Sequence, residues 1–340
     1  MADTAPPPAR PRTGLAARWR SVLRTGNPPA GAVDPITRWL VLTRAAVLPM
    51  TLTSAAIAGL LAVGQADFAP GLWVLAAAGL VVAHMANNLM NDLFDLEVGT
   101  DTPDYPRALY APHPVLSGLI SRRGLARAAL VLNLVDAGVL ATLVAARGWV
   151  VAAFAGAGFV LSAAYTAPPL RLKRRGLGEP SVLVVWGPLM VGGTYYAAVG
   201  HLPWAVVAAS LPYALLCTSV LMGKHIDKLA WDGAAGVRTL PVLLGEPAAR
   251  AVTRGLLGAF YLVTTALVAA GTLPATALVV SVAVGRLRAV WRAFGRPRPE
   301  RPPQGFPVWP LWFAPLAFLH ARRAGTLFVI GLAADALLTA

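Results

Sequence analysis

Charged residues are scarce in this chain. They make up 13% of its 340 residues, whereas about a quarter of the residues in a soluble domain are charged. Hydrophobic residues account for 57% of the chain. So few charges exclude an ordinary soluble domain, and the composition predicts an integral membrane protein surrounded by membrane lipid.

Cysteine is almost absent, and histidine is rare. The one cysteine, Cys217, lies in an apolar stretch, which excludes an intrachain disulfide framework and a thiolate metal site. The five histidines show no spacing typical of ligands to one zinc ion. They are His84, His113, His201, His225 and His320.

Acidic residues are fewer than basic ones, 15 against 29, which gives a formal net charge of +14. The basic residues are confined to the gaps between apolar stretches. This arrangement encodes the topology of membrane proteins, and we therefore expect no nucleic-acid partner.

Nine apolar stretches approach the roughly 20 residues that cross a bilayer as a helix. They predict an all-α bundle of about nine transmembrane helices. Arg286 and Arg288 interrupt the eighth stretch, and residues 306–319 form a shorter apolar piece that we expect to be interfacial or re-entrant. The nine stretches lie near residues 41–64, 70–90, 125–146, 148–167, 181–199, 203–222, 255–271, 273–290 and 325–338.

Basic residues recur in every second gap, and the alternate gaps are short and nearly free of charge. The positive-inside rule then places the N-terminus in the cytoplasm and the C-terminus outside, in the plasma membrane. Residues 1–34 are rich in Pro, Arg and Ala and lack the apolar core of a secretory signal, so they predict a disordered basic cytoplasmic tail. Residues 35–340 are expected to form one transmembrane domain.

A polar cluster ends the second apolar stretch. Asn88, Asp92 and Asp95 are four and three residues apart, so a helix projects all three from one face. Acids at a membrane edge are costly and usually functional, and hard oxygen ligands suit Mg²⁺. The alternative is a helix that simply ends in a polar turn in water.

A second polar cluster follows the sixth stretch. Asp227 and Asp232 lie there with Lys224 and Arg238. Such a mixture can bind a diphosphate, through Mg²⁺ on the acids and direct contacts from the bases. An ordinary solvated loop that balances its own charge would look the same.

A third polar segment separates the fourth and fifth stretches. Pro168 and Pro169 end a helix, a basic run follows at residues 171–175, and Tyr165 lies at the membrane edge. Positive-inside signalling and an interfacial anchor would explain these residues equally well. Two Asp-rich stretches on the same predicted side nevertheless suggest Mg²⁺ ions around one diphosphate, with an isoprenoid chain sheathed by the apolar bundle beneath.

Taken together, these motifs resemble the UbiA superfamily of intramembrane prenyltransferases. The matching pieces are NDLFD at 91–95, the pair Asp227 and Asp232, the YTAPP and GLGEP flanks, and RTLPVLLGE at 238–246. The resemblance implies nine helices around a lipid-open cavity capped by cytoplasmic loops. It also implies Mg²⁺-dependent transfer of a polyprenyl group from its diphosphate to an acceptor, commonly an aromatic ring.

The same resemblance implies roles for individual residues. Mg²⁺ would be held at Asn88, Asp92, Asp95, Asp101, Asp227 and Asp232. Diphosphate oxygens would contact Asn88, Lys224, Arg238, Arg171, Lys173 and Arg44. The catalytic set would be Asp92, Asp95, Asp227, Asp232 and Tyr165, with the Tyr165 ring facing the carbocation.

The position of Asp101 and the segment 176–196 look like the menaquinone-type (1,4-dihydroxy-2-naphthoate) branch. Against that branch, Gly223 and Lys224 replace its paired Asn residues, and four residues rather than three separate the two later aspartates. An aromatic or quinone-precursor prenyltransferase is therefore the leading interpretation. A membrane terpene cyclase without acceptor is the alternative, and a transporter is a third class, disfavoured because the mid-span acids Asp136 and Asp335 are isolated.

Overall fold

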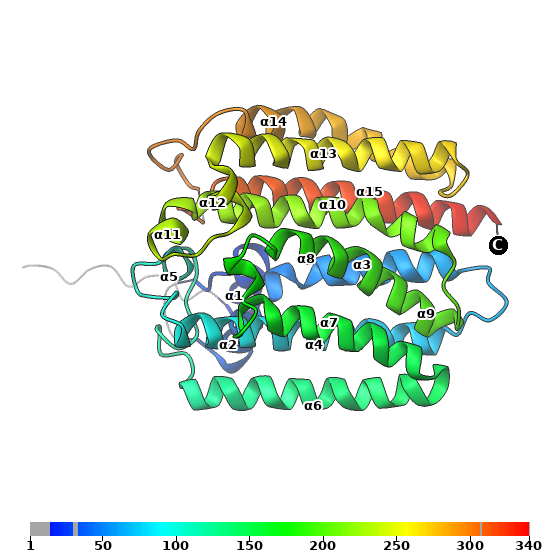
Figure 1. Ribbon diagram of the computed structural model, residues 1–340, viewed down its shortest axis with the longest axis horizontal. Helices are drawn as coiled ribbons and strands as arrows, with labels where there is room; N and C mark the ends of the chain where they lie inside the picture. The colour runs from blue at the N-terminus through cyan, green and yellow to red at the C-terminus, as the bar shows by residue number, and fades with distance from the viewer. Residues whose placement is uncertain (1–13, 30–32, 307, 340) are drawn as a thin grey trace, which may run out of the picture.

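The computed structural model describes residues 14–29, 33–306 and 308–339, and within these ranges the chain is helical without a named strand. The long helices lie side by side along one axis, and the short helices α5, α11 and α12 gather at one end (Figure 1). The helices are α1 (Leu15–Thr25), α2 (Pro35–Leu42), η1 (Ala45–Val47), α3 (Leu48–Ala62), α4 (Pro70–Glu97), α5 (Pro106–Tyr110), α6 (Arg122–Arg147), α7 (Trp149–Thr166), η2 (Leu172–Arg174), α8 (Gly178–Val184), η3 (Val185–Gly192), α9 (Gly193–Val199), α10 (Trp204–Asp227), α11 (Leu229–Ala234), α12 (Leu240–Leu244), α13 (Glu246–Ala269), η4 (Ala275–Ala283), α14 (Val284–Phe294) and α15 (Phe313–Thr339).

Among the described residues, eight helical segments are long and apolar enough to cross a membrane. The predicted all-helical membrane fold is thereby confirmed. The stretch predicted near 273–290 is also helical, as η4 followed by α14, and it packs beside α13 and α15. Arg286, Arg288 and Arg292 make it too polar to count among the eight.

The C-terminal helix differs from the prediction. Residues 313–319 do not belong to a separate re-entrant piece, because α15 runs without a break from Phe313 to Thr339. Pro315 is the third residue of this helix, where the backbone N–H groups have no intrahelical partner and the ring costs little. Residues 313–319 of the apolar piece and the last predicted span are therefore one helix.

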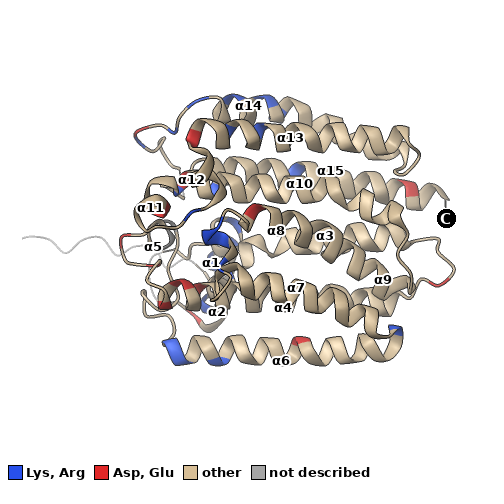
Figure 2. Cartoon of the chain, in the orientation of Figure 1, with Lys and Arg blue, Asp and Glu red and all other residues tan. Residues whose placement is uncertain are grey.

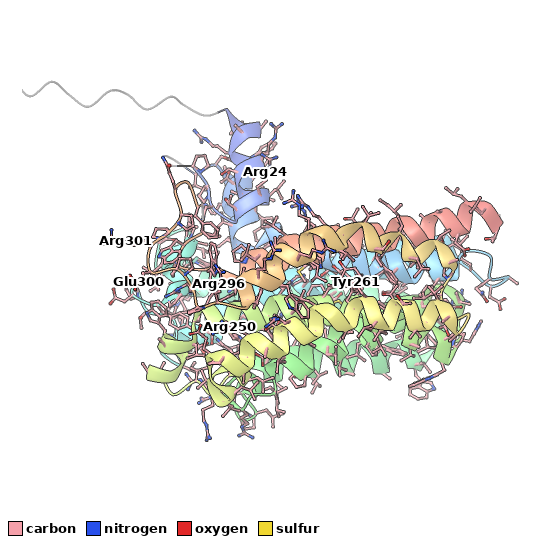
Figure 3. All side chains as sticks on the ribbon, turned by 90° about the horizontal axis from the view of Figure 1, so that it is seen from above. Arg24, Arg250, Tyr261, Arg296, Glu300 and Arg301 are labelled. Carbon is pink, nitrogen blue, oxygen red and sulfur yellow. The ribbon has the colours of Figure 1, made fainter. Side chains whose placement is uncertain are left out.

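The predicted disordered tail also contains a helix. α1 carries the fully buried Val22, and Trp19 Nε1 donates a hydrogen bond to Asp34 Oδ1 at 3.2 Å. Asp34 in turn caps α2 by accepting from the Thr37 amide at 2.9 Å. The expectation of disorder is therefore wrong for residues 15–25, while residues 1–13 and 30–32 lie outside the described residues. Figure 3 shows α1, with Arg24 near its end, crossing the direction of the long helices.

Lys and Arg gather at the end of the bundle that holds the short helices (Figure 2). We call this the basic end. Acids near the same place belong to the end of α4, to α8 and to the segment around α11. The chemistry expected from the sequence therefore lies at one end of an apolar bundle.

Helix α10 lies in the main core and packs against α8, η3, α13 and α15. Small residues permit the closest approaches. A Cβ atom on Gly331 of α15 would lie 2.6 Å from the Thr276 carbonyl oxygen of η4. The ninth helical segment is thus held against α15 backbone to backbone.

We expect Gly331→Ala to lower stability by about 1–3 kcal/mol, because the backbone of η4 cannot yield as a side chain could. Thermal unfolding in detergent, followed by circular dichroism, measures this. Gly255→Ala on α13 is the matched control, because its Cβ would meet nothing within 4 Å and alanine favours a helix by up to about 1 kcal/mol. Equal melting temperatures for the two variants would contradict this packing.

Candidate active site at the basic end of the bundle

The last turns of α4 place the first acidic cluster. Asn88 and Asp92 are buried on one face of this helix, as their spacing predicts. Arg44 Nη2 lies 2.5 Å from Asp92 Oδ1, and Asn88 Nδ2 donates to the Thr43 carbonyl at 2.9 Å. The segment that begins the first span is therefore tied to the acids that end the second.

Arg44 and Arg171 share an unusual backbone. Among the described residues they are the only non-glycine residues with positive φ, at 52° and 45°. Such conformations cost about 1–3 kcal/mol and persist where the surroundings impose them, often at functional sites. Each arginine directly precedes a short 3₁₀ helix, η1 or η2, at the basic end.

The loop after α4 brings Asp101 and His113 back to Asp92. One ligand atom from each of the three lies within 4.8 Å of the others, and all three are buried. The His113 Nδ1 atom accepts from the Val115 and Leu116 amides, both at 3.3 Å, which leaves the ring proton on Nε2. That Nε2 lies 3.3 Å from Asp101 Oδ2 and 4.0 Å from Asp92 Oδ1, so this edge of the His113 ring faces both acids.

The loop after α7 supplies a buried cation. Lys173 Nζ contacts Asp95 Oδ2 at 2.9 Å, and Arg174 Nη2 donates to Thr100 Oγ1 at 2.7 Å. This loop also pairs with the loop after α11, through an isolated backbone bridge between Arg175 and Arg238. Two basic segments that are distant in sequence therefore close over the end of α4.

The second aspartate cluster contributes one of its two acids. Asp232 is fully buried and accepts a hydrogen bond from the Tyr105 hydroxyl, which itself accepts from Lys228 Nζ at 2.8 Å. Lys228 Nζ also lies 3.9 Å from Asp232 Oδ1. The other oxygen, Asp232 Oδ2, is buried without a hydrogen-bond partner.

Buried charges in this cluster hold one another ionised. Burial opposes ionisation of Asp101, yet the hydrogen bond from His113 and the charge of Lys173 keep its pKa below the ordinary value. Burial likewise opposes ionisation of Asp232, but Lys228, His225 and Lys173 lower its pKa. For Lys173 burial favours the neutral amine, and the Asp95 carboxylate outweighs it and raises the pKa. The cluster is therefore a set of paired charges.

Asp227 lies apart from this cluster. Its two carboxylate oxygens accept hydrogen bonds from the Phe313 and Ala314 amides, at 2.9 and 2.8 Å. These amides begin α15 and have no intrahelical partner, so Asp227 acts as a tertiary cap that joins α10 to α15. The structure thus gives this residue a structural use that the sequence pattern did not indicate.

A cavity of about 500 Å³ opens beside the charged cluster. Arg24, Arg44 and Lys224 lie around it together with Asn88 and Tyr165, whereas most of its remaining lining is apolar. We call it the main cavity. Of the predicted diphosphate contacts, Arg238 is exposed on the surface, and Arg171 is half-buried with its Nε unpartnered.

The Tyr165 side chain is held by a buried pair. Its hydroxyl lies 3.5 Å from His225 Nε2, and His225 Nδ1 lies 2.6 Å from Glu179 Oε1. Glu179 and His225 are both almost completely buried. These side-chain contacts, from Glu179 through His225, orient the Tyr165 ring at the boundary between the charged cluster and the main cavity.

Sequence reasoning missed several residues of this site. Tyr105, His113, Lys228 and the pair formed by Glu179 and His225 had no predicted role. Each is a single polar residue in a loop or at a helix end, with no periodic partner. Only Glu179 carried a signal, as the acid of the GLGEP flank that follows a helix-ending pair of prolines.

Comparison with known proteins identifies relatives of this chain by sequence. The chain is 29% identical over 249 residues to 2-carboxy-1,4-naphthoquinone phytyltransferase of Synechocystis sp., covering 70% of this chain and 76% of that protein. It is 30% identical over 218 residues to 1,4-dihydroxy-2-naphthoate octaprenyltransferase of Escherichia coli, covering 62% and 70%.

Solved structures share the fold at lower identity. The apo structure of a UbiA homolog from Aeropyrum pernix K1 matches with a TM-score of 0.61 at 21% identity, covering 85% of this chain and 98% of that one. A UbiA homolog from Archaeoglobus fulgidus, bound to GPP and Mg²⁺, matches with a TM-score of 0.56 at 16% identity, covering 86% and 99%.

The UbiA prenyltransferase family matches residues 52–334, which include α4, the site loops and most of α15. The resemblance found in the sequence motifs is thereby confirmed over most of the chain. This protein belongs to the UbiA prenyltransferase family and is an integral membrane prenyltransferase.

Proposed function

We propose that this enzyme transfers a prenyl group from a polyprenyl diphosphate to an aromatic quinone precursor, with Mg²⁺ as cofactor, at the cytoplasmic side of the plasma membrane. The observation that carries the proposal is the buried group Asp92, Asp101 and His113 beside a largely apolar cavity of about 500 Å³. The acidic group can hold a diphosphate through Mg²⁺, and the apolar cavity can hold an isoprenoid chain.

The donor set fits Mg²⁺. Asn88, Asp92, Asp95, Asp101 and Asp232 offer hard oxygen atoms, and the buried Asp232 Oδ2 has no hydrogen-bond partner. Asp227 fits poorly, because backbone amides already occupy both of its oxygens. Bound Mg²⁺ would neutralise charge on the diphosphate leaving group. The Archaeoglobus homolog with GPP and Mg²⁺ supports this assignment.

The cations of the site are positioned for the same diphosphate. Arg44 contacts Asp92, and Lys173 contacts Asp95. These two acids would bind the same diphosphate through Mg²⁺. Lys224 lines the main cavity. Charge-assisted hydrogen bonds from such groups fix the diphosphate and favour its departure. Arg171 and Arg238 extend the positive charge at the basic end.

The Tyr165 ring would stabilise the carbocation left on the prenyl group. Tyr165 lines the main cavity, and His225 and Glu179 act as positioning residues for it. Attraction between a cation and an aromatic face is strongest in a dry site, and the apolar lining excludes water.

The acceptor is proposed to be an aromatic ring such as 1,4-dihydroxy-2-naphthoate. The two relatives named above act on naphthoquinone-type compounds by their names, and both are prenyltransferases. This favours transfer to an acceptor over intramolecular cyclisation. Positive charge at the basic end, by the positive-inside rule, supports a cytoplasmic active site.

We expect product only when both substrates are present. Purified protein with geranyl, farnesyl, geranylgeranyl or longer diphosphates, with and without 1,4-dihydroxy-2-naphthoate or 4-hydroxybenzoate, is assayed by mass spectrometry of the lipid extract. EDTA should abolish the product and added Mg²⁺ restore it. A hydrocarbon or terpene alcohol formed from diphosphate alone would instead establish a cyclase.

Asp92→Asn and Asp95→Asn should each lower kcat/KM by about a hundredfold or more, because each removes a negative charge that would anchor Mg²⁺ beside the diphosphate. Asp335→Asn, an isolated acid on α15, serves as the control. Retention of full turnover in either folded α4 variant would show that these acids do not carry the chemistry.

Tyr165→Phe should keep most of the activity, because the aromatic face remains. Tyr165→Ala should lose more, up to about thirtyfold if the cation contact contributes about 2 kcal/mol. Steady-state rates of the two variants at saturating substrates measure the difference. If Phe and Ala are equally defective, the hydroxyl and not the ring is the group that matters.

A further inference from the structure

A second, smaller cavity of about 190 Å³ lies between α4, α6, α7 and η3. We call it the side chamber. Along α4 it follows one helical face, at Ala76, Gly79, Leu80, Ala83, His84 and Asn87. The eleven residue steps from Ala76 to Asn87 span about 16 Å, so the chamber extends from the position next to Asn88 toward the opposite end of the bundle.

The side chamber adjoins the main cavity. Five residues line both spaces: His84, Asn87, Ser162, Val185 and Trp186. Among them, the His84 and Trp186 rings meet edge to face, with centroids 5.3 Å apart and an interplanar angle of 85°. These two rings therefore lie at the boundary between the two spaces.

The His84 ring and the Trp186 backbone both contact hydroxyl groups of α3. His84 Nδ1 lies 2.7 Å from Thr51 Oγ1, and the Trp186 carbonyl accepts from Ser54 Oγ at 3.0 Å. Trp186 belongs to η3, a π-helical stretch that contains Pro188. Such stretches are rare and occur often at functional sites. The boundary is thus held by α3 and is not a loose contact.

The walls of the side chamber are mainly apolar. Phe154, Phe159 and Leu189 line it opposite α4. The one acid, Asp136, lies flat against α4, because a Cβ on Gly79 would be 3.3 Å from its Oδ1. An apolar cavity of about 150 Å³ can hold benzene, so this space admits hydrocarbon.

The main cavity offers hydrocarbon another direction, toward α15. Leu319 exposes half of its surface on that side, and Phe159 of the side chamber exposes slightly more, so both spaces reach the surface of the bundle. The side chamber differs in following one face of α4, which suits an extended hydrocarbon tail. It begins at Asn87, which directly precedes Asn88 of the charged cluster in α4.

We propose that the side chamber receives the distal isoprene units of the donor, and that the His84–Trp186 pair sets the chain length at which the tail must enter it. This rests on the proposed prenyl transfer. Short donors then fit within the main cavity, and longer ones extend along α4 past the two rings.

Glycines of α7 provide a matched test. Gly158 lines the side chamber, and a Cβ there meets nothing within 4 Å, so a large side chain can fill the space without a clash at the backbone. Gly156, two residues earlier, also meets nothing within 4 Å but does not line the chamber. Gly158→Phe and Gly156→Phe thus make the same change in one helix.

The measurement is kcat/KM for geranyl and geranylgeranyl diphosphate with a fixed aromatic acceptor. We expect Gly158→Phe to lower the geranylgeranyl-to-geranyl ratio about tenfold or more, because one methylene group in a filled apolar pocket already changes kcat/KM by that order. Gly156→Phe should leave the ratio at the wild-type value. A second variant, Trp186→Ala, should raise the ratio by opening the boundary.

Other outcomes would overturn the inference. An unchanged ratio in folded Gly158→Phe, with active wild-type protein, would show that the tail lies elsewhere. If Gly158→Phe instead raises the KM for the aromatic acceptor with both donors, the side chamber holds the acceptor and not the prenyl tail. Absence of transfer by wild-type protein from every donor would contradict the proposed function itself, which separates the two failures.

Discussion

The mutual compensation of buried charges at the basic end is the constraint on which the structure depends. Asp92, Asp101, Asp232 and Lys173 are all buried, and an isolated charge in such a place would cost several kcal/mol. Each therefore has a partner from another part of the chain. Arg44 comes from the start of the first span, Lys173 from the loop after α7, and Tyr105 from the loop after α4.

This compensation fixes the ends of helices relative to one another. The acids at the end of α4 meet their cationic partners only because the segments before α3 and after α7 come to them. Segments of the bundle that are distant in sequence therefore converge at one end, while the apolar remainder packs through small residues and the core around α10. An apolar cavity next to a charged cluster follows from this division.

Two aspartates five residues apart illustrate how position decides use. Asp227 ends α10 and caps the first amides of α15, which ties the helix that leads into the site to the last helix of the bundle. Asp232 lies beyond the helix end, is held by Tyr105 and Lys228, and faces the charges of the first cluster. An aspartate thus serves as a structural cap at position 227 and as a candidate metal ligand at position 232.

The amino-acid sequence by itself determined the membrane class, the helical fold and the face of α4 that carries Asn88, Asp92 and Asp95. These follow from composition and from helical spacing, which are local properties. It also indicated the family through motifs whose order is preserved along the chain. Tertiary structure alone decided that Asp227 caps α15, that His113 and Tyr105 join the site, that residues 15–25 are helical, and that residues 313–319 begin the last helix. Those outcomes depend on which buried donor or acceptor meets which partner across the bundle, and a linear pattern does not contain that information.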